Sequence, residues 1–380
     1  MPPAPAPPIP SLLEALKAVP DHRSPSGKRH ELSSILAFAC CGMLCGAKSL
    51  LAIFEWGRAH QEWCCEVFGF QRCTPCVNTL HLVFKHLAVA AFEPVLHNWL
   101  TLQSVHQLQA SLRPIAIDGK ALRGSKTESL AGISLLSAFA ADCDLVEAQI
   151  AIRSKDNEIT KAPQLLASIS LEGRVVTGDA IFTQRSICQT IIESGGHYLF
   201  EVKDNQSCLK ADIARFFFQD LEKLEHVQTQ QQGHGRLDIR TLHTRSLNPG
   251  ELNWVGAQQV CRLIHQSRRH NQWSVQVHYK ITSLSPAQAG ARELLALSRG
   301  HWGIENRVHY VRDVTLAEDA SRIRTGSAPQ AMTAIRNWVL TVLRQAGIVN
   351  IAAGLRQFGW QIQRAAKVLG LSSPCSTPFH

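Results

Sequence analysis

Two acidic residues of this chain each follow a short apolar run of β-favouring residues. Asp118 comes directly after Ile115–Ile117, and Asp179 comes after Arg174–Gly178. Both runs predict buried strands, and a strand is a rigid element that can hold a carboxylate in a fixed position. Taken alone, Asp118-Gly119 is better explained as a turn that follows a strand. The chemical interpretation therefore depends on partners elsewhere in the chain.

A third acid, Glu305, lies in a segment whose apolar residues recur at helical spacing. A winding of about 3.6 residues per turn predicts that it shares one stripe of this helix with His301, His309 and Arg312. Such a stripe is typical either of a site or of a solvated face. The acids that lie close to Glu305 in the sequence are alternatives for the third position: Asp313, Glu318 and Asp319.

Three carboxylates that meet at one point repel one another and persist together only when a cation offsets their charge. Hard oxygen ligands in that number suit Mg²⁺ or Mn²⁺, and a pair of such ions about 3.5–4 Å apart serves in-line phosphoryl transfer. Asp118, Asp179 and Glu305 are therefore the predicted catalytic residues and metal ligands, provided that the helix crosses the edge of the sheet.

The charge balance of the chain favours a polyanionic partner. Its 380 residues contain 39 Lys and Arg against 30 Asp and Glu, which gives a formal net charge of +9. Nucleic acid is the simplest partner of this kind. Glycine-rich patterns of the Walker or dinucleotide-binding type are absent, which argues against ATP or NAD as a cofactor.

The periodicity changes along the chain and predicts a mixed α/β fold preceded by a helical domain. Helical spacing dominates up to about residue 110, and strands that alternate with helices follow. A run of strands without helices interrupts this pattern before helical spacing returns. The predicted segments are a Pro/Ala-rich tail (1–10), a helical domain (11–110), the first part of the α/β core (111–223), a β-rich insertion (224–284), the second part of the core (285–347) and a basic C-terminal tail (348–380).

One apolar run, 35–54, is about long enough to span a membrane. It contains Lys48 and is followed by Glu55, so a buried helix or helix pair is the better interpretation, and no membrane contact is expected. The 12 cysteines do not form the pattern of a disulfide framework, which indicates a protein of the reducing cytoplasm. Cys73 and Cys76 have the spacing of half a zinc site or a redox pair, but no matching second pair accompanies them, which favours ordinary thiols.

Four groups of motifs follow one another along the chain. They are Pro20-Asp21-His22-Arg23 with Gly27–Leu32, Ile117-Asp118-Gly119-Lys120 through Gly124, Gly178-Asp179-Ala180 with Val202–Gln206, and Gly300–Asn306 with Asp313-Val314 and Glu318–Arg322. In this order they resemble the motifs of DDE transposases of the H-repeat-associated insertion-sequence family, which have an RNase H-like catalytic core. The resemblance extends over most of the chain, from about Leu12 to Gly347.

The resemblance implies an RNase H-like mixed sheet with helices on both faces and with the insertion placed before the last catalytic helix. It also implies that Asp118, Asp179 and Glu305 form the catalytic triad of an enzyme that depends on Mg²⁺ or Mn²⁺. Such an enzyme cleaves element ends in double-stranded DNA and joins them to target DNA, and the pairing of two ends suggests a homodimer. The alternatives are an inactive or domesticated DNA-binding protein of this fold and a metal-dependent nuclease without strand transfer.

Basic residues near these motifs are the candidates for holding DNA. Arg268 and Arg269 lie at the tip of a predicted hairpin in the insertion, for which a merely solvated end is an equally good interpretation. The full set predicted to contact DNA is Lys120, Arg123, Lys203, Arg268, Arg269, Arg299, His301 and Arg312.

Overall fold

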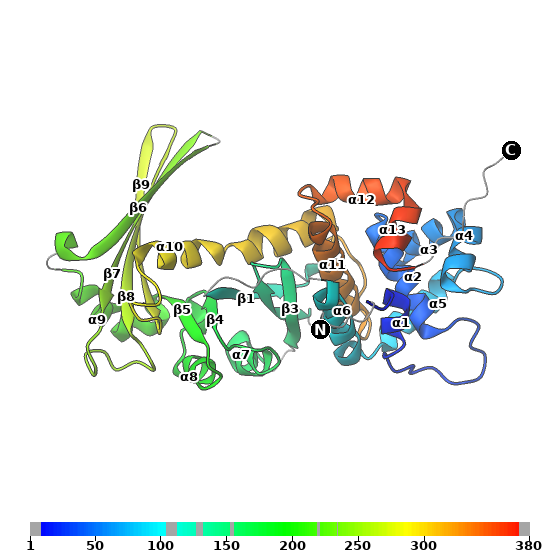
Figure 1. The fold of residues 1–380 in the computed structure, drawn as a ribbon, viewed down its shortest axis with the longest axis horizontal. Coiled ribbons are helices and arrows are strands. Elements are labelled where there is room, and N and C mark those ends of the chain that lie inside the picture. Colours follow the sequence, from blue (N-terminus) through cyan, green and yellow to red (C-terminus); the bar gives the residue numbers. More distant parts are fainter. Residues whose placement is uncertain are drawn as a thin grey trace, which may run out of the picture.

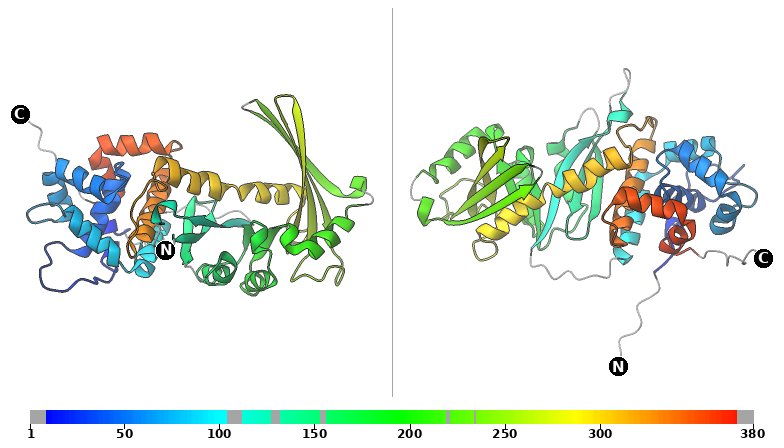
Figure 2. Two further views of the ribbon diagram at one scale, coloured as in Figure 1. Left: turned by 180° about the vertical axis from the view of Figure 1, so that it is seen from behind. Right: turned by 90° about the horizontal axis from the view of Figure 1, so that it is seen from above.

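The computed structural model describes residues 9–103, 112–126, 132–152, 156–218, 221–233 and 235–371. These residues form three parts in a row: a helical body, a central sheet with helices on its faces, and a set of long strands at the far end (Figure 1). Both views in Figure 2 show the same order. Most of the predicted N-terminal tail and the end of the predicted C-terminal tail lie outside the described residues.

Six helices from the N-terminal part of the chain build most of the helical body. Its centre is α2, in which every residue from Leu32 to Leu44 is buried. The apolar run 35–54 forms α2 and the first half of α3, as predicted for a buried helix pair. The six helices are α1 (Leu12–Leu16), α2 (Leu32–Leu44), α3 (Leu50–Ala59), α4 (Gln61–Phe68), α5 (Val77–His86) and α6 (Val89–Gln103).

Among the described residues, no single helix is both long enough and apolar enough to cross a membrane. By length and composition alone, α5 and α6 meet this criterion as a pair, but the chain bends by 98° between them. Both helices contribute fully buried side chains, such as Phe84 and Phe92, to the core of the helical body.

The C-terminal part of the chain returns to the helical body. There α11 (Ala328–Gln345) packs against α6 and α2, and α12 (Ile351–Trp360) and α13 (Ile362–Val368) follow it. The prediction of a basic tail is therefore wrong for these last two helices. Their apolar positions are buried in the common core, whereas the basic residues that suggested a tail are exposed on the outside.

The central sheet has the strand order of an RNase H-like fold, β3-β2-β1-β4-β5. In it, β2 pairs antiparallel with β1 and β3, whereas β1, β4 and β5 run parallel to one another. This arrangement confirms the predicted fold class. The strands are β1 (Arg113–Ala121), β2 (Ser134–Ala140), β3 (Leu145–Ile152), β4 (Arg174–Gly178) and β5 (His197–Val202).

The β-rich insertion extends this sheet and does not form a separate one. Its last strand, β9, pairs antiparallel with β5, and β8, β7 and β6 follow in turn, which gives nine strands in one sheet. These long strands form the far end of the molecule (Figure 1). They are β6 (Glu225–Gly233), β7 (Arg236–Ser246), β8 (Gln259–Arg269) and β9 (Gln272–Thr282).

Helices cover both faces of the sheet, and the alternation of β1 separates the two cores. Ile115 and Ile117 belong to the core on the side of α7, α8 and α9, whereas Ala116 packs with Ile304 and Val308 on the other side. On that second side, α10 continues through two π-helical segments, η5 and η6, toward the helical body (Figure 1). These elements are α7 (Glu158–Leu166), α8 (Arg185–Glu193), α9 (Ser207–Arg215), α10 (Ala291–Gly300), η5 (Ile304–His309) and η6 (Val311–Thr315).

Close packing of α2 against α3 depends on a glycine. A Cβ atom on Gly57 would lie 2.3 Å from Cζ of Phe38, a distance that packed atoms do not reach. We therefore expect Gly57→Ala to lower the free energy of unfolding of the helical body by about 1–3 kcal/mol in urea denaturation. Because Phe38→Leu shortens the opposing side chain, the double variant should lose less than the sum of the two single losses. Additive losses would show that the helices do not meet at this point.

Candidate active site

Parallel pairing of β1 with β4 brings the first two acids side by side. Ala116 pairs with Thr177, so the same register two residues further on places Asp118 beside Asp179. Side chains two apart on a strand point to the same face. Ala116 packs against the helix that continues from α10. Both carboxylates therefore point to the face of the sheet that this helix covers.

Backbone N–H groups hold both carboxylates at their strands. Oδ1 of Asp118 accepts a hydrogen bond of 2.9 Å from the N–H of Gly119, and Oδ1 of Asp179 accepts one of 3.0 Å from the N–H of Ile181. Loss of surrounding water raises the pKa of Asp179, the Ile181 N–H opposes this, and the negative charge of Asp118 raises the pKa further. The charge of Asp118 thus acts on Asp179, and a bound cation relieves repulsion of this kind.

A further acid, which the sequence pattern did not reveal, lies close to this pair. Glu158 is the first residue of α7, and its pKa is raised by burial and then by the charges of Asp118 and Asp179. Its carboxylate lies over the backbone of Gly119, because a Cβ atom there would be 2.0 Å from Oε1 of Glu158. In the sequence it is an ordinary acid of a first helical turn, so nothing marks it as part of a site.

The third acid, Glu305, lies on the π-helical segment η5. Widening of a helix to this form is frequent at functional sites. Glu305 is exposed and lines the same cavity as Asp179. Its side chain makes no hydrogen bond or ion pair within the described part of the chain. The structure therefore places this carboxylate at the cavity, where none of the described side chains holds it.

Two histidines on this helix contact the two acid-bearing strands. Nδ1 of His309 lies 3.2 Å from Oδ2 of Asp118, and Nδ1 of His301 lies 3.3 Å from Oγ1 of Thr177. Burial lowers the pKa of His301 to about 4, so its ring is neutral at neutral pH. His301 also lines the cavity, where a contact with DNA stays a prediction.

The donor set of the site fits a hard divalent cation. Asp118, Asp179 and Glu305 offer carboxylate oxygens, the ligands that Mg²⁺ and Mn²⁺ prefer. Within the described ranges, no three His, Cys, Asp or Glu side chains are arranged to hold a metal ion. Here His309 engages Asp118, and Glu305 lines the cavity. For the three carboxylates to contact one cation, their side chains must rotate, whereas the register of the strands need not change.

A cavity of about 900 Å³ extends from Asp179 and Glu305 along the long strands of the insertion. Residues at even spacing on β7 and β9 line it, because such residues share one face of a strand. That spacing was the available sequence signal, but it does not tell which face of the strands meets the acids, so most of these residues could not be identified from the sequence. The basic lining residues are Lys203, Arg236, Arg240, His265, His278, Lys280, Arg299, His301 and Arg307.

One acid of β5 balances this basic wall. Burial raises the pKa of Glu201, but a 2.6 Å hydrogen bond with His278 and the charges of Lys280 and Lys203 bring it down to about 2. Lys203 lies 3.4 Å from Glu201 and is itself exposed. Among the predicted DNA contacts, Lys203 and Arg299 therefore line the cavity with their charged groups accessible.

Two family models match this chain. Residues 109–342 match the model described as a transposase DDE domain, and residues 13–100 match the DDE_Tnp_1-associated model. The chain belongs to the DDE transposase family. Membership makes it a relative of enzymes that act on DNA, which agrees with carboxylates placed beside a basic cavity.

Relatives of this transposase extend over nearly its whole length. The "H repeat-associated putative transposase YhhI" of Escherichia coli strain K12 is 31% identical over 362 residues, which cover 91% of this chain and 93% of the relative. The "Putative transposase YncI" of Escherichia coli O157:H7 is 31% identical over 348 residues, 88% of each chain. A solved structure, the piggyBac transposase synaptic complex with hairpin DNA, aligns with a TM-score of 0.45 and 9% identity over 94% of this chain and 78% of that one.

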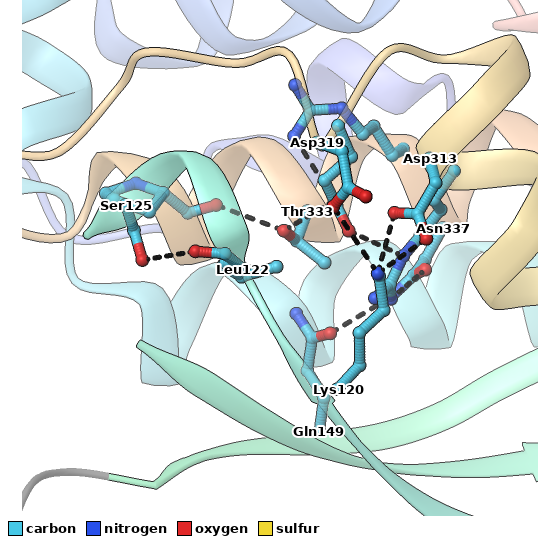
Figure 3. A network of polar contacts seen from close by, with 12 residues as sticks. Lys120, Leu122, Ser125, Gln149, Asp313, Asp319, Thr333 and Asn337 are labelled. Atoms are coloured by element: carbon cyan, nitrogen blue, oxygen red, sulfur yellow. Dashed lines mark hydrogen bonds and ion pairs between the residues drawn. The ribbon is translucent and has the colours of Figure 1, made fainter. Parts of the chain in front are cut away.

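Two residues that follow Asp118, Lys120 and Arg123, were predicted to contact DNA, and their surroundings differ from each other. Lys120 lies 2.7 Å from Asp313 and 3.8 Å from Asp319, as Figure 3 shows, and its side chain is only 10% exposed. It links β1 to η6, so the prediction that it contacts DNA does not fit this arrangement. The side chain of Arg123 is 80% exposed, although its Nη1 lies 3.6 Å from Asp319, and it stays accessible to DNA.

The two arginines at the hairpin between β8 and β9 do not line the main cavity. The guanidinium of Arg268 lies 5.6 Å from the ring centre of Trp273. Arg269 lines a separate cavity of about 300 Å³ together with Arg236. Both arginines are exposed, and their contact with DNA stays a prediction.

Arg312 is fully buried, so the prediction that it contacts DNA is wrong. Its Nε lies 3.0 Å from Oε1 of Glu318, and Nη1 of Arg336 lies 3.3 Å from Oε2 of the same carboxylate. Thr333 donates a further hydrogen bond of 2.9 Å to Glu318. The prediction assumed regular helical winding, but the π-helical segments displace later residues around the axis and turn Arg312 toward α11.

These contacts also separate the candidates for the third acid. Glu318 is held between two guanidinium groups, and Asp313 is paired with Lys120. Asp319 lies near Lys120 and near the more distant Arg123. Each alternative therefore already has a cationic partner, whereas Glu305 has none within the described ranges. The geometry favours Glu305 as the third acid.

We expect Glu318→Gln to destabilise the transposase by roughly 3–5 kcal/mol, because it leaves two buried guanidinium groups without a counter-charge. The free energy of unfolding from chemical denaturation measures this loss. Glu14→Gln is the control, since Glu14 pairs with Lys17 on an exposed surface and its loss should cost less than about 1 kcal/mol. Equal effects of the two substitutions would contradict the buried ion cluster.

Proposed function

We propose that this chain is the transposase of an insertion sequence, which cleaves the ends of its element and joins them to target DNA. The observation that carries the proposal is the register of β1 and β4, which sets Asp118 beside Asp179 on the side of the helix that bears Glu305. Carboxylates on rigid elements beside a basic cavity suit phosphoryl transfer between DNA strands. Family membership supports the same reaction class.

Asp118, Asp179 and Glu305 are the residues that would hold Mg²⁺ or Mn²⁺. When bound there, the cation supplies activation of the attacking oxygen and offsets the charge of the leaving oxygen. The chain itself holds the two aspartates in place through backbone N–H groups. The backbone N–H of Gly119 holds one carboxylate oxygen of Asp118, and the ring of His309 lies against the other.

In the proposed reaction, water attacks a phosphodiester at the element end and leaves a free 3′-hydroxyl group. This hydroxyl then attacks a phosphodiester of the target, whose own 3′-oxygen leaves, so that element and target are joined. Lys203 and Arg299 both line the cavity and are suited to hold the phosphates of the bound strand.

We infer that the partner is double-stranded DNA, both as element ends and as target. Joining requires two ends to be held together, so a homodimer in the DNA complex is part of the proposal. Because its proposed substrates are chromosomal and plasmid DNA, the proposed location of the protein is the cytoplasm.

We expect Asp118→Asn and Asp179→Asn each to reduce metal-dependent cleavage by roughly a thousandfold, because each removes a ligand charge while it preserves the shape of the side chain. The substrate is a duplex that carries the sequences flanking this gene, and nicked and joined products are resolved on a denaturing gel. Binding of the duplex should persist in both variants.

The control for this experiment is Asp204→Asn, since Asp204 is 88% exposed and pairs with Lys210 on the surface. It should cleave like the parent protein. Full cleavage by both active-site variants would refute the site, and nicking without joined product in the parent would indicate a nuclease. Duplex binding without any metal-dependent cleavage would indicate a DNA-binding protein of the same fold.

We also expect the double variant Lys203→Ala with Arg299→Ala to weaken DNA binding and to lower the slope of log affinity against log salt concentration by about 2. Each Lys or Arg that no longer contacts a phosphate lowers by about one the number of counterions that DNA releases on binding. A salt titration of a fluorescent duplex measures the slope. Lys17→Ala with Arg215→Ala removes two exposed cations that lie outside the cavity, and an equal change in that control would contradict the assignment.

A further inference from the structure

Glu158 is held at a fixed place by the start of α7. Asn157 accepts a hydrogen bond of 2.9 Å from the N–H of Thr160, and the Thr160 side chain accepts one from the N–H of Asn157, which completes a capping box. The helix packs against β2, β3 and the short turn Ala180–Phe182 that directly follows Asp179. The first residue of α7 therefore approaches the acid-bearing strands from the face opposite α10.

A glycine makes room for the Glu158 carboxylate. A Cβ atom on Gly119 would lie 2.0 Å from Oε1 and 2.3 Å from Cδ of Glu158, so any side chain at position 119 would displace the carboxylate. Gly119 directly follows Asp118 in β1. The space that the missing side chain leaves is thus filled by a carboxylate from another element.

The sheet is open at this level. The described pairing of β1 with β4 ends at Ala116 and Thr177, so no strand pairing closes the gap between Asp118 and Asp179. A side chain that comes from α7 can therefore reach both acids through the end of the parallel pair.

Among the described residues, Glu158 has no cationic partner. Within the described part of the chain, its side chain makes no hydrogen bond or ion pair, and the charges that act on it are those of Asp118 and Asp179. Three carboxylates that lie this close to one another repel, and the partners near Asp118 and Asp179 do not reach Glu158 within the described residues. Other acids near the site are neutralised by the protein, as Glu201 is by His278 and Lys203.

We propose that Glu158 is an additional carboxylate of the metal site, which reaches the cation held by Asp118 and Asp179 from the α7 face of the sheet. The inference rests on the proposed function, and it adds a residue to the three acids named above. The octahedral shell of Mg²⁺ or Mn²⁺ has positions for it, because two aspartates and Glu305 do not fill that shell. Its contact with the cation is either direct or through a bound water.

The test uses the full chain without DNA and measures Mn²⁺ binding by titration calorimetry. Glu158→Gln should weaken binding by about 10–100-fold. It should also raise the thermal midpoint of the metal-free protein, since one repelling charge is gone, and reduce the rise in midpoint that Mn²⁺ produces. A purely structural glutamate would lower the metal-free midpoint and leave Mn²⁺ affinity unchanged.

Asp156→Asn is the matched control, because it removes one negative charge just before the same helix from a residue paired with Lys161. It should bind Mn²⁺ like the parent protein. Equal weakening in both variants would indicate a general charge effect and overturn the inference.

Gly119→Ala gives a second route to the same result, since it keeps every acid but displaces the Glu158 carboxylate. It should weaken Mn²⁺ binding, and the double variant with Glu158→Gln should be no weaker than the poorer single variant. Parent-like binding in both single variants would overturn the role of Glu158. If Asp118→Asn also bound Mn²⁺ like the parent, the proposed metal site itself would fail, so the two failures are distinguishable.

Discussion

The register of β1 against β4 is the constraint on which the site depends. Ile115 and Val176 are paired and fully buried under α7 and α8, on the face opposite the acids. A slip of one strand by one residue would turn its apolar side chain toward α10 and its carboxylate into the apolar core. The cost of burying an unpaired charge therefore adds to the cost of moving an apolar side chain out of its core. The same apolar alternation that builds the sheet thus also fixes Asp118 and Asp179 on one face.

The third acid depends on a helix that is anchored on both sides of it. Ile304 and Val308 pack on Ala116 and Phe139, so the apolar side of the helix lies on β1 and β2. Further along, Arg312 enters the ion cluster of Glu318 and Arg336 beneath α11. A buried cluster of this kind adds little net stability compared with apolar packing, but it tolerates only one arrangement of its charges. It therefore serves to set the rotation of the helix, and this leaves Glu305 at the cavity.

The apolar runs and their spacing were enough to predict a mixed α/β sheet and to place two acids at strands and one on a helix, whereas its RNase H-like type was expected from the family resemblance. They could not predict the rotation of residues after Glu305, because π-helical winding leaves no trace in a pattern read at regular helical spacing. Lys120 looked accessible because its partner Asp313 is 193 residues away in the sequence. Glu158 was missed for a similar reason, since its relation to Gly119 exists only after α7 packs on the sheet. The helices after residue 350 were missed because their basic residues concealed a narrow apolar side.

Continuity of the sheet joins the acids to the basic wall. In the pairing of β4 with β5, Thr177 lies opposite Leu199, so the same register two residues further on places Asp179 beside Glu201. Glu201 in turn pairs with Lys280 of β9. Asp118, Asp179, Glu201 and Lys280 thus occupy one row across four neighbouring strands, with about 4.8 Å between strands. His278 and the lysines neutralise Glu201, so the row changes from negative at β1 and β4 to positive at β9. The ladder pairs these strands up to Ala116 with Thr177 and Gly178 with Phe200, so it fixes the spacing of the strands from which the proposed cation site and the basic wall extend. An insertion built as a separate domain on a hinge could not hold that spacing, which gives a physical reason for the insertion to continue the catalytic sheet.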